Sequence, residues 1–267
     1  SSPADVARRS DVVLTSLPGP IEVEQVAIGP QGILEGIRPG AIYVDLSSSR
    51  PALIHRIGST FQKKDVHVID APLIVGKGGI ATRSVQVLAS GEEETFHRVK
   101  PVLDAFSDTV VYTGNLGTGS IIKLAHNLVR RSVGLAIGEG IILGAKAGVD
   151  PQVLWDCMYW GLDVQLSRLR TSFPPKVEVV NNEDPPASFT LALSRKDVGL
   201  ATELGRELDV PMPIANLVEQ VMIEGMNRGW GQRSTAALFR LQEEAAQVMA
   251  RPVPRATKGP TLARKGV

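Results

Sequence analysis

The feature that most constrains the fold is the alternation of short apolar runs, rich in Val and Ile, with helical segments in the first half of the chain. Strands are expected over residues 11–17, 41–45, 66–70, 84–89 and 109–113, and helices over 21–28, 52–64 and 92–106. A helix is also expected from Pro3, with Ser2 as its N-cap and Asp5 facing the helix dipole. Strands that alternate with helices at this spacing predict an α/β fold, a doubly wound, mostly parallel sheet with helices on both faces.

The pattern changes after Gly119, where the strand runs stop and a helical period of 3.6 residues takes over. Helices are expected over residues 120–148, 152–161, 190–208, 213–228 and 234–249, the first of them long and central. The chain is therefore expected to consist of an α/β part (1–116), an all-helical part (117–250) and a disordered basic tail (251–267).

Charge and composition exclude several classes of protein. The chain of 267 residues has 29 basic and 28 acidic side chains, and five of the basic ones fall in the last 17 residues, which hold no acid. The remaining body is mildly acidic, which argues against nucleic acid as the main partner. The single cysteine, Cys157, excludes an internal disulfide and a two-cysteine metal site, and no metal is expected.

No segment predicts a membrane span or a secretory signal. The most apolar stretch, residues 132–149, is interrupted by Glu139 and Lys146, and the first ten residues have no apolar core. We therefore expect a cytoplasmic protein that does not bind membranes.

The Gly-rich phosphate turn of a dinucleotide-binding sheet is missing. Such a sheet opens with a strand, a Gly-rich turn and a helix. Here the first strand follows a helix, no G-x-G-x-x-G precedes it, and Gly114, Gly117 and Gly119 lie at the wrong end of the sheet. The first βαβ unit is thus expected to be absent from this chain, which is expected to bind a cofactor weakly or not at all. The residue that distinguishes NAD from NADP would follow the missing second strand.

The strongest cluster of chemically competent residues runs from Gly117 to Asn127. The glycines permit a tight entry into the long helix, where Lys123 and Asn127 lie four residues apart and project from one face. A partly desolvated lysine can act as a general acid or base, and an adjacent carboxamide can orient a hydroxyl or carbonyl group. On spacing alone, a solvent-facing lysine and a helix-surface asparagine are the favoured interpretation, since lysine is usually exposed.

The chain resembles the β-hydroxyacid dehydrogenase family, which includes 3-hydroxyisobutyrate dehydrogenases, tartronate semialdehyde reductases and 6-phosphogluconate dehydrogenases. The resemblance covers nearly all of residues 1–248. It rests on the order and spacing of five segments, which are Leu17-Pro18, Asp45 to Pro51, Asp70-Ala-Pro72 through Gly76, Gly117 to Asn127, and Phe189 followed by Lys196-Asp197-Val-Gly-Leu-Ala.

This resemblance implies an incomplete Rossmann-type dinucleotide-binding domain (1–116), followed by a helical substrate and oligomerisation domain (117–250) that is built on the long helix. It also implies hydride transfer between a small hydroxy acid and NAD or NADP, in a crevice between the two domains. Lys123 is similar to the family's catalytic lysine, which removes the hydroxyl proton in oxidation, and Asn127 to its substrate-orienting partner. The implied cofactor-binding residues are Leu17, Pro18, Ser48 and Lys196.

The chain also departs from the family pattern. The substrate-binding segment reads Ile74-Val75-Gly76 where the family has Ser-Gly-Gly, which implies a substrate carboxylate held differently or a larger, less polar substrate. Arg83, which replaces a glycine, is expected to be either an anion clamp or a solvated turn residue. Other departures are His126, expected to pack beside the site, and Glu22, expected to weaken a cofactor contact.

Aromatic side chains and glycines indicate close packing around the long helix. Trp155, Tyr159 and Trp160 fall within six residues and suit a core or a subunit interface, or alternatively an apolar wall of a substrate pocket. The long helix is rich in glycine, and in the family it helps to join subunits. A homo-oligomer, dimer or tetramer, is therefore expected.

Two other functions remain open. The missing phosphate turn and the departures at Ile74, Val75 and Arg83 favour a catalytically silent relative that acts in protein assembly. An imine-reducing relative shares the fold and favours apolar pockets, but such relatives usually carry another residue in place of Lys123.

Overall fold

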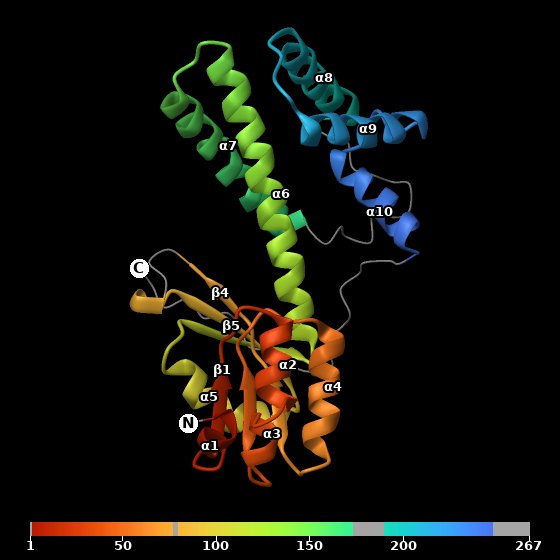
Figure 1. The fold of residues 1–267 in the computed structure, drawn as a ribbon. Coiled ribbons are helices and arrows are strands. Elements are labelled where there is room, and N and C mark those ends of the chain that lie inside the picture. The colour runs from red at the N-terminus through yellow and green to blue at the C-terminus, as the bar shows by residue number, and fades with distance from the viewer. Residues whose placement is uncertain (1, 77–79, 173–189, 248–267) are drawn as a thin grey trace. The chain divides into compact units, whose positions relative to one another are not determined.

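The computed structural model describes residues 2–76, 80–172 and 190–247. The chain divides into two compact units, residues 1–131 and 132–267 (Figure 1). The first unit contains the sheet, and the second is helical. The boundary falls inside a long helix that begins in the first unit. The tail predicted from residue 251 lies outside the described residues.

The first unit contains all five predicted strands and the four helices that were predicted among them, from Pro3 and over 21–28, 52–64 and 92–106. Its elements are α1 (Pro3–Ala7), β1 (Val12–Thr15), α2 (Pro20–Ile28), α3 (Ile33–Gly36), β2 (Ile42–Asp45), α4 (Pro51–Gln62), β3 (His67–Asp70), β4 (Leu73–Val75), a 3-10 turn (Ile80–Thr82), β5 (Val85–Gly91), α5 (Glu93–Asp104) and β6 (Thr109–Gly114). The predicted start of α1 is confirmed, since Ser2 and Asp5 form a reciprocal capping box. The short elements α3 and β4 were not predicted.

The sheet is parallel over its first three strands and then changes direction. β1 pairs with β2 and β2 with β3 in parallel, whereas β3 and β4 each pair with β5 in antiparallel fashion, and β6 is parallel to β5. The described part of the link between β3 and β5 holds only β4 and a 3-10 turn. Because parallel strands need a long crossover, usually a helix, this short link returns β5 in the opposite direction.

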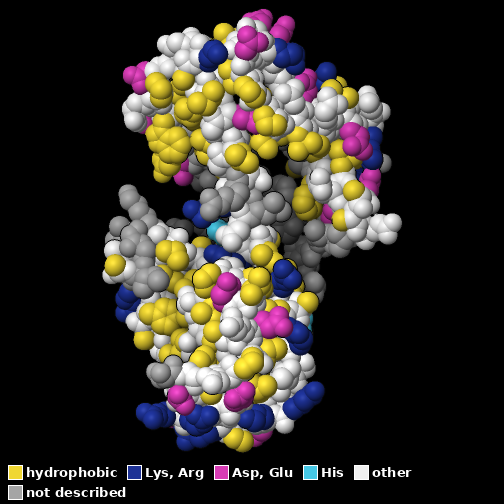
Figure 2. Space-filling model, in the orientation of Figure 1, with side chains coloured by type: hydrophobic (Ala, Val, Ile, Leu, Met, Phe, Trp, Pro, Cys, Tyr) yellow, Lys and Arg dark blue, Asp and Glu magenta, His cyan; other side chains and the backbone are white. Residues whose placement is uncertain are grey.

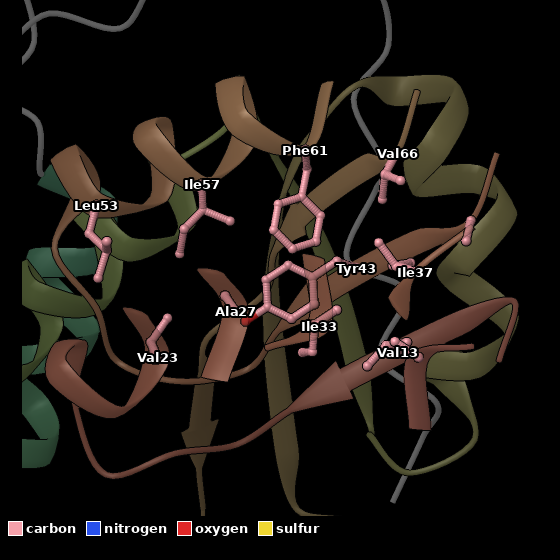
Figure 3. Packing of buried hydrophobic residues seen from close by; sticks show 12 residues of the cluster. Val13, Val23, Ala27, Ile33, Ile37, Tyr43, Leu53, Ile57, Phe61 and Val66 are labelled. Carbon is pink, nitrogen blue, oxygen red and sulfur yellow. The ribbon is translucent and has the colours of Figure 1, made fainter. Parts of the chain in front are cut away.

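Alternate residues of the strands face two separate cores. Tyr43 of β2 packs with α2, α3 and α4 on one face, and its ring stacks on Phe61 of α4 with centroids 5.2 Å apart (Figure 3). Its neighbours Ile42 and Val44 face the opposite core, where α5 contributes Phe96 among others. Helices therefore cover both faces, as the apolar runs predict.

The second unit is helical, as expected. It contains most of α6 (Thr118–Lys146), then α7 (Pro151–Ser172), α8 (Leu191–Glu207), α9 (Pro213–Asn227), a 3-10 turn (Thr235–Leu238) and α10 (Phe239–Ala246). The helix predicted over 152–161 is longer than expected. Within the described ranges the only β pairing of this unit is an isolated bridge between Thr190 and Ser234. None of the described helices is long and apolar enough to cross a membrane.

Two features of α6 that stand out in the sequence have packing roles. At Gly140 and Gly144 a Cβ atom would come within 3.0 Å of Met158 and 2.5 Å of Leu154, so these glycines let α7 approach closely. Glu139 accepts hydrogen bonds from the backbone amides of Ile214 (2.7 Å) and the next residue (2.9 Å) at the start of α9. The charge that interrupts the apolar stretch therefore caps another helix.

The aromatic cluster of α7 is exposed. Trp155 is 44%, Tyr159 62% and Trp160 73% exposed, and apolar side chains gather over the α6–α7 part of the molecule (Figure 2). Of the places expected for these rings, a core formed by the described residues is therefore excluded. An interface or a pocket wall stays a prediction.

Candidate functional site

A row of buried polar side chains crosses the sheet at the carboxyl ends of its parallel strands. Thr15, Asp45 and Asp70 end β1, β2 and β3 and are direct neighbours in register, and Ser90 of β5 lies opposite Asp70. All four are buried. In open α/β sheets ligands bind at this edge, so the row marks the place to look for a site.

Asp45 organises the first half of this row. Its Oδ1 atom accepts hydrogen bonds from the Thr15 hydroxyl (3.0 Å) and the Ser47 amide (3.1 Å), and the Ser47 hydroxyl in turn accepts from the Leu17 amide (2.9 Å). Burial raises the pKa of Asp45. Its Oδ2 atom is buried with no partner among the described residues. The network fixes the loops that follow β1 and β2.

Asp70 organises the second half of the row. It accepts hydrogen bonds from the Ser120 amide (2.8 Å), the Ser120 hydroxyl (2.7 Å) and the Ser90 hydroxyl (3.1 Å). Burial raises its pKa to about 6, against the opposing effect of these bonds. The carboxylate therefore ties the first turn of α6 to the end of β3, where the helix dipole favours a negative charge.

Two glycines make this junction possible. The amides of Gly117 and Gly119 both donate to the Ser90 hydroxyl, each at 3.2 Å. Gly117 has a φ of +89°, and a Cβ atom on Gly119 would lie 2.2 Å from the Leu88 carbonyl oxygen. The expectation that glycines permit a tight entry into α6 is confirmed by this geometry.

Lys123 lies one turn further along α6, against strand β4. Its half-buried amine donates a hydrogen bond to the backbone carbonyl of Leu73. Burial, and secondarily the charge of Arg130, lower the pKa of Lys123. Asn127 follows at the next turn, half-buried, and its carboxamide has no hydrogen-bond partner among the described residues. The lysine is thus not a solvent-facing side chain, and its chemistry suits proton transfer.

Three of the predicted cofactor residues lie on loops at the carboxyl ends of β1 and β2. Leu17 is half-buried, whereas Pro18 and Ser48 are exposed. The helices that follow these loops, α2 and α4, begin with no side-chain cap on their free amides. Free amides at the start of a helix favour an anionic group. Lys196 is exposed on α8 in the second unit, 3.2 Å from the Asp197 carboxylate.

The segment that departs from the family pattern forms the unpredicted strand β4 and its end. Ile74 is half-buried, Val75 and Gly76 are exposed, and the Gly76 amide donates to the Ser84 carbonyl (2.7 Å). The strand therefore presents apolar side chains beside the carbonyl that holds Lys123.

Arg83 is an exposed residue of a turn, as one of its two expected roles requires. Its guanidinium donates to the carbonyl oxygens of Asp104 (2.5 Å) and Ser107 (3.1 Å) at the end of α5. It caps that helix, so its guanidinium is engaged and not poised for an anion. The two other departures lie on helix surfaces, His126 half-buried on α6 and Glu22 exposed on α2.

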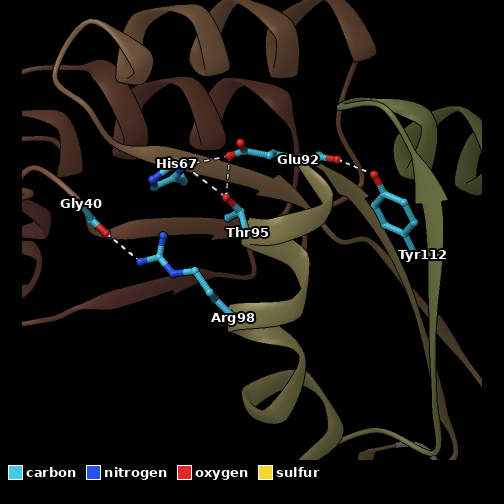
Figure 4. Close-up of polar contacts among 7 residues, drawn as sticks. Gly40, His67, Glu92, Thr95, Arg98 and Tyr112 are labelled. Atoms are coloured by element: carbon cyan, nitrogen blue, oxygen red, sulfur yellow. Dashed lines mark hydrogen bonds and ion pairs between the residues drawn. The ribbon is translucent and has the colours of Figure 1, made fainter.

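A separate polar cluster lies at the other end of the sheet, where strand β3 begins. His67 at the start of β3 and Thr95 of α5 both hydrogen-bond to Glu92, at 3.1 and 2.9 Å (Figure 4). These bonds, the Thr95 hydroxyl first, hold the pKa of Glu92 below its ordinary value. The cluster joins α5 to β3 and contains none of the predicted site residues. Within the described ranges there is no cluster of three or more potential metal ligands.

Two family models together cover most of the chain. The NAD binding domain of 6-phosphogluconate dehydrogenase matches residues 1–114, and the NAD-binding domain of NADP-dependent 3-hydroxyisobutyrate dehydrogenase matches residues 117–242. A probable mitochondrial 3-hydroxyisobutyrate dehydrogenase of Dictyostelium discoideum is 30% identical over 247 residues, covering 90% of this chain and 75% of the relative. The chain belongs to the β-hydroxyacid dehydrogenase family. It is accordingly an NAD(P)-dependent oxidoreductase of hydroxy acids, as the sequence resemblance implies.

Other relatives of this β-hydroxyacid dehydrogenase have different names. The 2-(hydroxymethyl)glutarate dehydrogenase of Eubacterium barkeri is 28% identical over 244 residues, covering 91% of this chain and 79% of the relative. Among solved structures, an imine reductase from Pseudomonas sp. has a TM-score of 0.77 at 14% identity, covering 90% of this chain and 82% of that one. A reductive aminase from Aspergillus terreus, in complex with NADPH and ethyl levulinate, has a TM-score of 0.78 at 16% identity, covering 91% and 82%. At these identities the two structures share the fold alone.

Proposed function

We propose that Lys123 is the general acid and base of hydride transfer between a 3-hydroxy acid and its semialdehyde or oxo partner. The observation that supports this most is the position of its amine, half-buried against the Leu73 carbonyl with a lowered pKa, one turn before Asn127. An amine that titrates below its ordinary range exchanges protons more readily near neutral pH.

In oxidation, neutral Lys123 accepts the proton of the substrate hydroxyl while the hydrogen on the alcohol carbon leaves as hydride, so that the alcohol becomes a carbonyl group. A bound nicotinamide supplies the hydride acceptor, or the donor in the reverse direction. Asn127 holds the hydroxyl or carbonyl oxygen, and the Leu73 carbonyl holds the amine in place. In reduction, protonated Lys123 returns its proton to the carbonyl oxygen.

We assign cofactor contacts to Leu17, Pro18, Ser48 and Lys196, with residues 1–116 as the dinucleotide-binding domain and 117–250 as the substrate and oligomerisation domain. Support for the first three comes from their loops at the carboxyl ends of β1 and β2. Lys196 lies in the other unit and rests on the family resemblance alone. The cytoplasmic location stays a prediction.

The substrate segment is Ile74, Val75 and Gly76. The names of the two relatives specify 3-hydroxyisobutyrate and 2-(hydroxymethyl)glutarate. Each of these compounds carries its hydroxyl group on the carbon that is β to a carboxylate. Transferred to this chain, they indicate a substrate of the 3-hydroxy acid type. The apolar side chains of β4 would contact its hydrocarbon part.

The exposed rings of Trp155, Tyr159 and Trp160 support a homo-oligomer, dimer or tetramer. Aromatic residues are enriched in the buried centres of subunit interfaces. We propose that this surface, on the outside of α7, is covered by a second copy.

The test is a substrate panel on the full-length protein with NAD⁺ or NADP⁺, or their reduced forms. The panel contains 3-hydroxy acids, their oxo partners and cyclic imines. Turnover of hydroxy acids, lost in Lys123→Ala, supports the proposal. Turnover of cyclic imines alone would favour the imine-reducing alternative, which the apolar side chains of Ile74 and Val75 suggest. Cofactor binding with no turnover of any compound would favour the catalytically silent alternative.

A further inference from the structure

We propose that Arg130 binds a carboxylate of the substrate at a distance from the reacting alcohol, so that the enzyme prefers dicarboxylic hydroxy acids. This inference rests on the proposed function and names a residue that determines its specificity. It starts from the face of α6 that carries Lys123.

Arg130 lies on the same stripe of α6 as the two proposed catalytic residues. Lys123, Asn127 and Arg130 are spaced i, i+4 and i+7, which places them along one face of an α-helix. The electrostatic effect of Arg130 on the Lys123 amine agrees with this placement. A substrate that reaches Lys123 and Asn127 from this face therefore also meets a guanidinium group.

The charge of Arg130 is not used within the described chain. Its side chain is exposed and has no ion pair or hydrogen bond among the described residues. The acidic residue of its own helix, Glu139, is engaged by the amides of Ile214 and Ala215. A guanidinium without a carboxylate partner, next to a proton-transfer group, is free to hold an anionic ligand.

Among the residues that the structure describes around Lys123, no other cation is similarly available. Arg83, on the segment that follows β4, is bound to the carbonyl oxygens of Asp104 and Ser107. The side chains of β4 itself, Ile74 among them, are apolar. Arg130 is therefore the described side chain near Lys123 that is best suited to a carboxylate.

The spacing sets the substrate class. Seven residues of helix correspond to a rise of about 10 Å between the Cα atoms of Lys123 and Arg130. Both side chains are long enough to lean toward each other. Even so, a substrate carboxylate that binds Arg130 must be several bonds away from the substrate alcohol that contacts Lys123. A second, distal carboxylate fits this distance better than the carboxylate next to the reacting carbon.

The experiment compares two substrates that differ in the distal carboxylate, 2-(hydroxymethyl)glutarate and 3-hydroxyisobutyrate, with the full-length protein. We expect Arg130→Gln to lower kcat/KM for the dicarboxylate by roughly 10- to 100-fold, mainly through KM, because a charge-assisted hydrogen bond is lost. Both substrates are compared at a pH above the pKa of Lys123, where the loss of the Arg130 charge does not change the protonation of the amine, and there kcat/KM for 3-hydroxyisobutyrate should be nearly unchanged. Arg130→Lys should retain part of the preference. Arg9→Gln is the matched control, since it removes an exposed arginine before the amino end of β1.

Equal losses with both substrates, or no loss with either, would overturn the inference while leaving the proposed function in place. Binding of the unreactive dicarboxylate glutarate, measured by calorimetry, gives a readout without turnover. We expect tighter binding to wild type than to Arg130→Gln, and equal binding would contradict the inference. Selective glutarate binding together with no turnover of any hydroxy acid would contradict the proposed function alone.

Discussion

The carboxylate of Asp70 accepts two hydrogen bonds from Ser120, one from its amide at 2.8 Å and one from its hydroxyl at 2.7 Å, across fifty residues of sequence. Lys123 lies three residues after Ser120, and its amine binds the carbonyl of Leu73, three residues after Asp70. The short segment from Asp70 to Leu73 thus holds both the start of α6 and the amine that this helix carries. Asp70 is a positioning residue for Lys123.

Asp70 should make the stability of the protein depend on pH. Burial raises its pKa from 3.8 to about 6, so the folded state binds more protons than the unfolded state between these values, and its contribution to stability falls as the pH rises through this range. The Asp70→Asn variant should lack this component. The measurement is the free energy of unfolding from denaturant titrations at pH 4.5 and 6.5.

Asp104→Asn is the control, since it changes an exposed carboxylate that pairs with Lys100. The buried Asp45 contributes with the same sign as Asp70, and Asp5 and Glu92, whose pKa values are lowered, with the opposite sign. All three remain in both variants and cancel in the comparison. Identical pH slopes for wild type and Asp70→Asn would contradict this account.

Gly119→Ala should destabilise the junction between the sheet and α6. The new methyl group would lie 2.2 Å from the Leu88 carbonyl oxygen, which is backbone and cannot move aside cheaply. We expect a loss of about 2 kcal/mol or more in the free energy of unfolding, as for other overpacked sites.

Gly134→Ala is the matched control on the same helix, because no atom lies within 4 Å of its new methyl group. It should be neutral or stabilise the helix by about 0.5–1 kcal/mol. Equal effects of the two substitutions would show that the tight entry into α6 does not matter for stability.

The pH dependence of oxidation should report the environment of Lys123. Because the amine must be neutral to accept a proton, kcat/KM should rise with pH and level off above its pKa, which burial and the charge of Arg130 hold below 10.5. In Arg130→Gln the rise should move to higher pH, and in Arg9→Gln it should not move. A profile that is the same in all three proteins would contradict the assigned coupling.

The proposed interface can be tested through Trp160, the most exposed ring of its cluster. Trp160→Asp should shift the oligomer toward monomer, because a carboxylate would be buried without a partner. Sedimentation velocity of the full-length protein measures this, with Ile21→Asp, an exposed apolar residue on α2, as control. An unchanged distribution of species in Trp160→Asp would exclude this surface as the interface.

The strands β1, β2 and β3 were predictable because each is a short run, rich in β-branched residues, that ends at a polar residue. The runs VVLT and IYVD end at Thr15 and Asp45, and these same residues form the polar row across the sheet. That row was not predicted as a unit. The signal was present in the recurring polar end, but the sequence does not show which strand ends are neighbours, since this depends on strand order. β4 is only three residues long and lacks a strand-length pattern of its own.

Site prediction succeeded where local spacing carries the information. The placement of Lys123 and Asn127 on one helix follows from their separation by four residues. The contacts of Lys123 with Leu73 and of Arg83 with Asp104 join segments that are 50 and 21 residues apart. Such contacts are set by the packing of α6 and α5 on the sheet, which no local pattern encodes. Of the two roles expected for Arg83, the exposed turn residue is confirmed, whereas its capping of α5 was not predicted.

The central claim is that Lys123 carries the proton of the reaction. The most direct measurement compares NAD(P)H formation by the full-length wild type and by Lys123→Met on 3-hydroxy acids, with cofactor binding followed in parallel by fluorescence. We predict a loss in kcat of roughly 10²- to 10⁴-fold, the range typical of a removed general base, with cofactor affinity unchanged. Wild-type turnover in Lys123→Met, with the cofactor bound, would contradict the claim.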